Sequence, residues 1–325
     1  MSAVIFVRSV RGTGFYEVGR AIAHVLNIEM TNNPARLLHY KTIIFVDSIY
    51  GSLTPLLLSK TFGKKTVLYI TAEGPFNPGV RKLLVGKRSF VATPSKYSAM
   101  ELLNQDMVVH KVIPHGIDTC ELPQVNGHSS KPYVEILSIV GDEVYKILGA
   151  THLLRAYARS RYLINNSRLI LKISPGKMEY FKKLLINLGI HNNVTLIPGY
   201  LTKKELYYLM GKADIYVHVS LSDAFGLPII ESMAMGTLAV VLNAPPWNEI
   251  VNENIGYLVR IRGEVVLNHK PPYRVRIPDI QDLSKILEDA VSQVSPSLYK
   301  KVRDYVINKF NAHILYKTFQ TLIET

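Results

Sequence analysis

The chain alternates short runs of β-branched and aliphatic residues with longer segments of helical periodicity, and this alternation constrains its fold more than any other feature. In the first part of the chain, the apolar runs fall at residues 3–7, 42–46, 66–70, 89–92 and 108–113. Segments of helical periodicity lie between them, near 16–26, 51–61 and 95–104. Strands that alternate with helices form a parallel sheet covered by helices on both faces. The pattern therefore predicts an α/β fold built on a doubly wound, Rossmann-like sheet.

The same alternation begins again after a polar stretch. From Asp118 to Pro132 the chain is rich in Pro, Gly and Ser, which is typical of a connection over the surface. Beyond it, strands are expected at 133–140, 167–173, 193–197, 214–219, 238–242 and 256–260. Helices are expected near 149–160, 177–189, 202–211 and 229–235. With 325 residues, of which 48% are hydrophobic, the chain is long enough to bury two cores.

We therefore predict two Rossmann-like domains, an N-terminal one over residues 1–122 and a C-terminal one over residues 123–325. Near the end of the chain, Leu283 and Leu287 belong to a set of apolar residues at helical spacing, and Asp279 precedes this set as a candidate N-cap. The closing helices are assigned to the second domain and are candidates to pack back on the first.

The charge of the chain points to anionic ligands without choosing among them. Thirty-eight Lys and Arg residues against 25 Asp and Glu residues give a net charge of +13. Such a field attracts nucleotides, nucleic acids, phosphorylated substrates and anionic lipids. Residues 80–88 place four cations beside aliphatic residues, a composition that suits peripheral contact with an anionic membrane, a phosphorylated acceptor or a solvated helix face.

Neither a membrane span nor a metal site is expected from the sequence. No run of 18 apolar residues predicts a spanning helix, and the first apolar run is five residues followed by Arg8, which indicates a buried strand rather than a secretory signal. Cys120 is the only cysteine, which favours an intracellular protein and excludes a site of several thiolates. The ten His residues show no paired-ligand spacing, so no metal or cofactor is expected, and His115 and His218 are interpreted as packed or loop histidines. The expected location is the cytoplasm, with peripheral membrane contact left open.

The most informative segment follows the expected strand at 214–219. It runs from Ser220 to Glu231 and contains Phe225-Gly226-Leu227-Pro228. Pro228 suits the first turn of a helix, and Gly226 allows the backbone to approach a ligand closely. The N–H groups of Gly226 and Leu227 would then face an anion, while Asp223 and Glu231 could both contact one ligand. A capped, solvated helix start is the alternative explanation of the same residues.

These residues resemble the signature of the family 4 retaining glycosyltransferases, which have the GT-B architecture of two Rossmann-like domains facing across a cleft. In that signature two acidic residues, separated by seven others, flank a Phe-Gly-Leu-Pro turn. Asp223 matches the first acid, which is usually Glu in the family, and Glu231 matches the second. Residues 112–118 are similar to the family's segment before the interdomain linker, and residues 192–200 to its base-contacting turn. The resemblance covers residues 108–325, whereas residues 1–107 share the fold pattern.

The resemblance implies a role for each matching residue. Glu231 would bind the ribose of a nucleoside diphosphate sugar, and Asp223 would contact the transferred sugar. The donor site would also include Phe225, Gly226, Leu227, Gly199 and Tyr200. The family holds the diphosphate with a basic pair, of which Lys146 falls near the Lys position. Asp142 stands where the family usually has Arg, so one phosphate cation differs in this chain.

Two loops of the N-terminal domain are further candidates. Gly12 and Gly14 follow the first expected strand and permit a tight turn with exposed amides, which favours contact with phosphate or acceptor over a purely structural turn. Glu73 follows the strand at 66–70 and could polarise an acceptor hydroxyl, with an exposed structural Glu as the alternative.

Together these features predict a glycosyltransferase of the hexosyltransferase type. It would move a sugar from a nucleoside diphosphate sugar to a glycan, lipid or protein acceptor, with retention of configuration implied by the resemblance. Lys146 and the amides at 225–227 would stabilise the leaving diphosphate without a divalent ion. The alternative is a non-catalytic GT-B-fold protein that binds a nucleotide or nucleic acid. Transfer to DNA is disfavoured because aromatic and basic residues are not interleaved and no recognition-helix motif is present.

Overall fold

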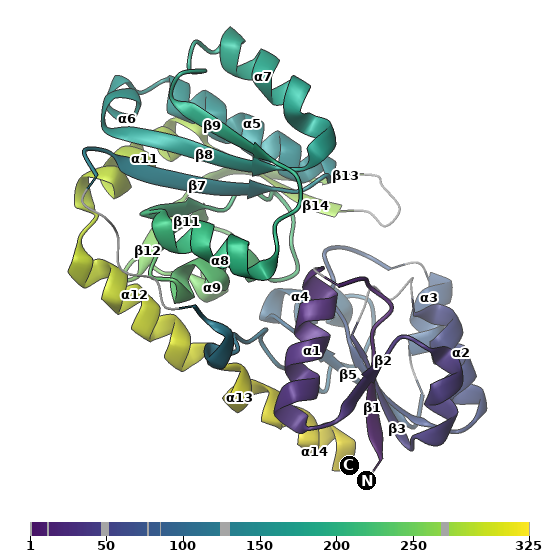
Figure 1. Cartoon of the computed structure of the whole chain (residues 1–325). Coiled ribbons are helices and arrows are strands. Elements are labelled where there is room, and N and C mark those ends of the chain that lie inside the picture. Colours follow the sequence, from purple (N-terminus) through teal and green to yellow (C-terminus); the bar gives the residue numbers. More distant parts are fainter. Residues whose placement is uncertain are drawn as a thin grey trace. The chain divides into compact units, whose positions relative to one another are not determined.

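The computed structural model describes residues 2–11, 13–46, 52–76, 78–84, 86–123, 131–267 and 273–324. The chain divides into two compact units. The first contains residues 1–120 together with residues 310–325, and the second contains residues 121–267 and 274–309. The expected division after residue 122 therefore lies close to the one in the structure, but the C-terminal segment belongs to the first unit (Figure 1).

The first unit is built on a six-stranded parallel sheet. Its strand order is β2 (Glu29–Thr31), β1 (Ala3–Phe6), β3 (Thr42–Val46), β4 (Lys65–Tyr69), β5 (Ser89–Thr93) and β6 (Lys111–Val112). The connecting helices are α1 (Gly14–Leu26), α2 (Leu53–Thr61), α3 (Pro78–Leu84) and α4 (Lys96–Leu103), with 3-10 turns at Pro34–His39 and Thr119–Glu121. All residues of β1 and β3 are buried, because helices cover both faces of the sheet.

The C-terminal segment completes this first unit. It comprises α13 (Ala312–Leu315), a 3-10 turn at Tyr316–Thr318 and α14 (Phe319–Glu324). The ring of Phe319 packs edge-on against Tyr69 at a centroid distance of 5.2 Å, and the Tyr316 hydroxyl accepts a 2.8 Å hydrogen bond from the Gly116 amide. A Cβ atom at Gly116 would lie 2.6 Å from the Cα atom of Ala312, so this close approach requires glycine.

The second unit contains another six-stranded parallel sheet. Its strand order is β12 (Gly256–Val259), β11 (Leu238–Leu242), β10 (Ile215–Val217), β7 (Val134–Val140), β8 (Ser167–Ile173) and β9 (Val194–Pro198). Its helices are α5 (Val144–Ala158), α6 (Arg161–Asn166), α7 (Met178–Asn187), α8 (Lys203–Lys212), α9 (Leu227–Ala234), α10 (Trp247–Ile250), α11 (Ile280–Gln293) and α12 (Pro296–Lys309), with a 3-10 turn at Pro175–Lys177. β13 (Ile261–Leu267) and β14 (Tyr273–Pro278) form a separate two-stranded sheet.

The structure confirms the predicted α/β class with two doubly wound parallel sheets. Asp279 caps α11 as predicted, because its side chain accepts hydrogen bonds from the amides of Gln281 and Asp282. The expected strand at 214–219 is wrong at its end, since β10 stops at Val217 and the chain then leaves the sheet. β2 and β13 escape the sequence analysis because β2 has only three residues and β13 is mostly exposed, so neither forms a buried apolar run.

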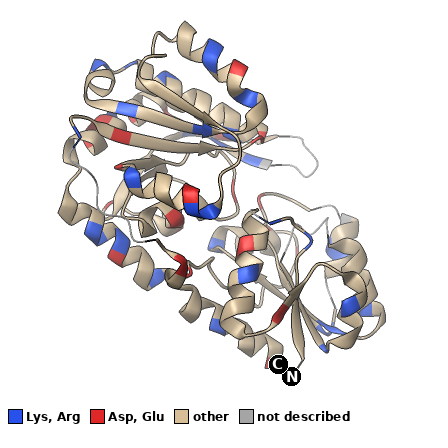
Figure 2. Cartoon of the chain, viewed as in Figure 1, with Lys and Arg blue, Asp and Glu red and all other residues tan. Residues whose placement is uncertain are grey.

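The basic segment at 80–88 differs from its expected character. Val80 and Leu84 on α3 are buried in the core of the first unit, so these aliphatic residues point inward. Lys82, Lys87 and Arg88 are the more exposed members of the segment. Lys and Arg residues are spread over the elements of both units (Figure 2). None of the described helices has the length and hydrophobicity needed to cross a lipid bilayer.

Candidate active site

The loop between β10 and α9 has a conformation that only its glycine permits. Gly226 is the N-cap of α9 and has φ +105°, in the left-handed region. A Cβ atom there would lie 2.8 Å from Ile229 Cδ1. Pro228 occupies the first turn of α9, where the missing N–H costs no hydrogen bond. The turn predicted from Gly226 and Pro228 is confirmed. The Ile229 amide donates a 3.0 Å hydrogen bond to the Gly226 carbonyl oxygen and Pro228 has no N–H, so the amides of Gly226 and Leu227 are those that this helix end could offer to a ligand.

Asp223 lies in this loop and is held by two ring nitrogens. Its Oδ2 atom is 2.6 Å from His218 Nε2 and accepts a 3.2 Å hydrogen bond from Trp247 Nε1. The other nitrogen of His218 lies 3.2 Å from the hydroxyl of Tyr216. Tyr216, His218 and Trp247 are buried, so the carboxylate of Asp223 is held in one orientation.

The polar surroundings of Asp223 keep its carboxylate ionised. Burial by itself raises the pKa of Asp223. The hydrogen bond from His218, the attraction of His218 and Lys146, and the hydrogen bond from Trp247 together outweigh burial, so the pKa lies below its usual value. Burial and the charges of Asp223 and Glu231 hold the pKa of Tyr216 well above its usual value. Tyr216 is therefore a neutral hydroxyl beside these two acids.

Lys146 lies in the first turn of α5 and acts electrostatically on Asp223. Its Nζ atom is 3.0 Å from Glu143 Oε1, in a partly exposed pair. The charge of Lys146 lowers the pKa of Asp223, although the two residues are far apart in sequence. Lys172 lies near the charge of Asp142, which raises the pKa of the lysine. Burial is the larger effect, so the pKa of Lys172 is lowered.

Glu231 is half-buried on α9, and its charge raises the pKa of Tyr216 together with that of Asp223. Phe225 is 5% exposed, so its side chain is part of the core. A ligand would therefore contact the main chain of Phe225 rather than its ring. Leu227 is half-buried at the start of α9.

The turn after β9 carries two further predicted residues. Gly199 has φ +100°, and a Cβ atom there would meet no atom within 4 Å. Tyr200 is 81% exposed, and the ammonium of Lys172 lies 5.7 Å from the centre of its ring. An aromatic side chain so exposed is suited to stacking on a flat ligand group.

The remaining predicted residues belong to the first unit. Gly14 begins α1, and the preceding Thr13 caps that helix with its hydroxyl. Gly12 lies outside the described residues. Glu73 is half-buried in the bend after β4, and its carbonyl oxygen accepts a 3.3 Å hydrogen bond from the hydroxyl of Tyr97.

Sequence reasoning missed the partners of Asp223. His218 is packed, as predicted, but it also contacts the candidate sugar-binding acid. Tyr216 and His218 are two residues apart at the end of a strand, a spacing that places both side chains on one face and could have signalled the pair. Trp247 is the first residue of α10, which follows β11, and it offered no local signal.

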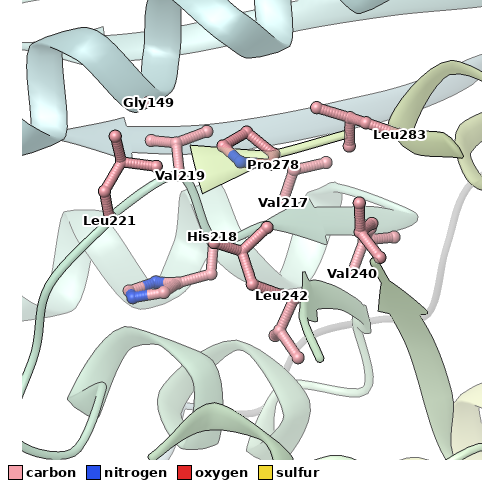
Figure 3. A pocket seen from close by; sticks show the side chains of 11 residues that line it. Gly149, Val217, His218, Val219, Leu221, Val240, Leu242, Pro278 and Leu283 are labelled. Atoms are coloured by element: carbon pink, nitrogen blue, oxygen red, sulfur yellow. The ribbon is translucent and has the colours of Figure 1, made fainter. Parts of the chain in front are cut away.

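A small apolar pocket lies next to His218 in the second unit (Figure 3). Val217, Val219, Leu221, Pro278 and Leu283 line it, and the ring of His218 points away from Pro278 and Leu283. A Cβ atom at Gly149 on α5 would lie 1.6 Å from the carbonyl oxygen of Val219. Gly149 therefore allows α5, which carries Lys146, to pack directly on the loop that carries Asp223.

The family model described as "Glycosyl transferases group 1" matches residues 135–266, which include Lys146, Asp223 and Glu231. Over this segment the chain is similar to the group 1 glycosyl transferases. Among curated proteins, the chain is 33% identical over 164 residues to MMP alpha-(1->4)-mannosyltransferase of Mycolicibacterium hassiacum, a match that covers 49% of the chain and 38% of that protein. It is 24% identical over 263 residues to the uncharacterized glycosyltransferase 335 of Sulfolobus islandicus rod-shaped virus 1, which covers 75% of the chain and 76% of the viral protein.

A solved structure extends the likeness in fold to the entire chain. The Anabaena protein Alr3699/HepE, solved in complex with UDP and glucose, superposes with a TM-score of 0.78. The match covers 100% of this chain and 99% of the Anabaena chain at 15% identity, so it concerns the fold. The group 1 glycosyl transferase segment thus lies in a chain with the two-sheet GT-B architecture that the resemblance implied.

Proposed function

We propose that the protein transfers a sugar from a nucleoside diphosphate sugar to an acceptor. The observation that carries this proposal is that Asp223, held by His218 and Trp247, lies in the loop that leads to the amino end of α9, with α5 and its Lys146 packed on that loop at Gly149. These residues lie within the segment matched by the glycosyl transferase model. A cation, a helix amino end and a fixed carboxylate are the groups needed to bind a diphosphate and a sugar hydroxyl together.

The diphosphate would be held by Lys146 and the amides of Gly226 and Leu227. Lys146 acts as a point charge, and the amides at the amino end of α9 add the positive end of the helix dipole. Negative charge grows on the diphosphate as the sugar bond breaks, so groups already oriented toward it lower the barrier. The pair of Lys146 with Glu143 is exposed enough for the ammonium to exchange that carboxylate for phosphate.

Asp223 would bind the transferred sugar and Glu231 the ribose. Both hydrogen bonds that hold Asp223 go to Oδ2, so Oδ1 is the atom that would meet a sugar hydroxyl. Tyr200 would stack on the base, with Gly199 leaving room for its approach. Gly14 and Glu73 remain proposed contacts of the first unit with phosphate or acceptor.

Two similar proteins support the choice of donor. One relative is named a mannosyltransferase, and the Anabaena neighbour holds UDP and glucose. We propose a glycan, lipid or protein as acceptor, retention of configuration, and a transfer step without a divalent ion.

Release of nucleoside diphosphate from UDP-glucose, GDP-mannose and related donors tests the proposal. Glu231→Ala and Lys146→Ala should each lower turnover at least tenfold. Lys183→Ala is the matched control, because Lys183 is an exposed lysine of α7 in the same unit. Wild-type turnover in both site variants would show that the site is elsewhere. Saturable nucleotide binding without release of diphosphate would favour the non-catalytic alternative.

A further inference from the structure

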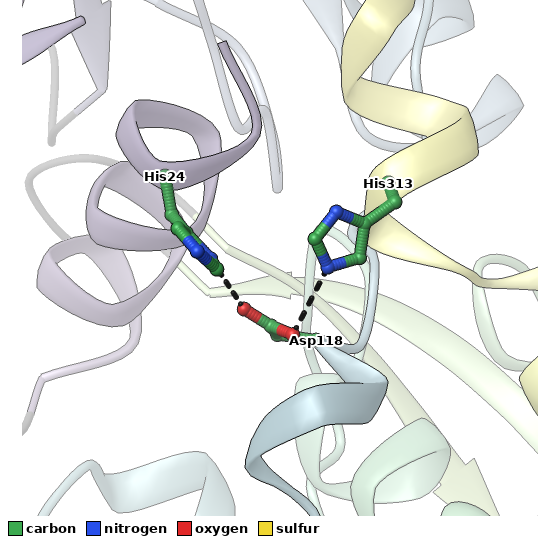
Figure 4. Close-up of side chains that lie close together, drawn as sticks. All are labelled: His24, Asp118 and His313. Atoms are coloured by element: carbon green, nitrogen blue, oxygen red, sulfur yellow. Dashed lines mark hydrogen bonds and ion pairs between the residues drawn. The ribbon is translucent and has the colours of Figure 1, made fainter. Parts of the chain in front are cut away.

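Three potential metal ligands, none of them assigned to the donor, meet in the first unit (Figure 4). They are His24 in the last turn of α1, Asp118 just before the turn at Thr119–Glu121, and His313 on α13. His24 Nδ1 lies 2.9 Å from Asp118 Oδ2, and His313 Nε2 lies 3.2 Å from Asp118 Oδ1. One ligand atom from each of the three residues lies within 4.8 Å of the other two.

The only cysteine of the chain lies beside this cluster. Cys120 Sγ is 4.0 Å from His313 Nε2, and the Cys120 amide donates a 3.1 Å hydrogen bond to Asp118 Oδ1. The cluster therefore contains two imidazoles and a carboxylate, with a thiol next to them. Zn²⁺ accepts all four of these groups, whereas Mg²⁺ and Ca²⁺ prefer oxygen ligands.

The three side chains are close enough for one ion to bridge them after a small movement. Metal–ligand bonds of about 2.0–2.3 Å place the ligand atoms of a tetrahedral zinc site roughly 3.3–3.7 Å apart. The two imidazole nitrogens lie 2.9 and 3.2 Å from the two different oxygens of Asp118, as expected of hydrogen bonds, and the sulfur lies 4.0 Å from His313 Nε2. Small rotations of the rings would open space for the ion, and the His24 side chain is 58% exposed and able to make one.

The cluster has a buried base and an open side. The side chain of Asp118 is 4% exposed, whereas that of His313 is 37% exposed. The two rings are oriented edge-to-face with their centres 5.6 Å apart, so they are not stacked on each other. An ion can therefore enter from the side of the two rings and meet a carboxylate that is already held in place.

We propose that His24, Asp118 and His313 bind Zn²⁺, with Cys120 available as the fourth ligand. The ion connects three parts of the first unit: α1, the segment that contains Asp118, and α13. Its binding therefore stabilises the packing of α13 in the first unit. Binding displaces the hydrogen-bonding protons of the imidazoles and the proton of the thiol. The site is structural, and none of its ligands is among the residues proposed for the transfer reaction.

Calorimetric titration of the EDTA-treated full-length protein with ZnCl₂ tests this inference. The expected result is saturable binding of one ion per chain and a rise in Tm that excess EDTA reverses. His24→Gln and His313→Gln should each weaken binding at least tenfold. His39→Gln is the matched control, because His39 is an exposed histidine of the same unit, and it should bind as the wild type does.

Substitution with Co²⁺ reports on the ligands directly. A four-coordinate site gives intense visible absorption, and a thiolate ligand adds a charge-transfer band that Cys120→Ser removes. Absence of saturable binding to the wild-type protein overturns the proposal, and this result needs no variant to fold. Equal affinity of the wild type, His24→Gln and His313→Gln overturns it as well. Either result would leave the three side chains as a hydrogen-bonded clamp.

Discussion

Nε2 of His218 lies 2.6 Å from Oδ2 of Asp223, inside the second unit and at the start of the loop that leads to α9. The sequence analysis interprets His218 as a packed histidine and Asp223 as the acid that contacts the sugar. The structure shows that the two side chains contact each other. It makes His218 a positioning residue, because its ring holds the carboxylate and is itself held by Tyr216.

Replacing His218 by Phe should change the pH dependence of turnover. Burial is the largest influence on the pKa of Asp223 and raises it, so the pKa should increase when the opposing contact with His218 is lost. The acid limb of the kcat/KM profile should then move to higher pH, and turnover at neutral pH should fall about tenfold. Tyr216→Phe keeps the contact with Asp223 and should shift the limb less. An unchanged acid limb in His218→Phe would contradict the positioning role.

Replacing Gly149 by Ala should destabilise the second unit. The new methyl group would lie 1.6 Å from the carbonyl oxygen of Val219, so α5 and the loop must separate. A cost of about 1–3 kcal/mol is expected from overpacking, with a lower affinity for donor because Lys146 moves relative to Asp223. Calorimetric unfolding and donor titration measure the two effects. Gly176→Ala is the control, since a Cβ atom there meets nothing within 4 Å.

The fluorescence of Trp247 should report donor binding. It is the only tryptophan of the chain, it is fully buried, and its Nε1 atom donates to Asp223. A sugar hydroxyl that engages Asp223 alters the charge next to the indole, so the emission should change in a saturable way with nucleotide sugar. Asp223→Ala should abolish most of the change. A full response in that variant would place the sugar away from Asp223.

The buried His115 should make the protein less stable in mild acid. Burial lowers the pKa of His115 from 6.5 to about 3, and the ring is neutral beside the hydroxyl of Tyr69. Between these values the unfolded chain binds a proton that the folded protein does not, so stability falls as the pH drops below 6.5. From pH 7 to pH 5 the loss should be about 2 kcal/mol from this group.

Urea unfolding followed by circular dichroism at both pH values measures this loss. His115→Gln removes the titrating group and should reduce the difference between the two pH values. Its stability at pH 7 serves as the reference, because the substitution itself alters packing. An identical pH dependence in the variant and the wild type would assign the effect to other groups.

The sequence by itself determined the features that depend on neighbouring residues. The alternation of apolar runs and helical periodicity predicts both parallel sheets, since each period follows from the geometry of one strand or helix. Asp279 at a helix start and Gly226 before Pro228 are local signals, and the structure has the predicted cap and turn at both places. Asp223 and Glu231 could be recognised together as candidate ligand-binding acids because both lie in one short segment.

Tertiary structure alone decided which distant residues meet. His24, Asp118 and His313 come from three separate segments, so no spacing rule could relate them. The closing helices were assigned to the second domain as candidates to pack back on the first, and residues 310–324 do pack in the first unit, because Tyr316 and Phe319 find their buried contacts there. Trp247 reaches Asp223 through the fold of two different loops. Local propensity depends on a few adjacent residues, whereas these contacts depend on how whole elements pack, and a single sequence carries no direct record of that packing.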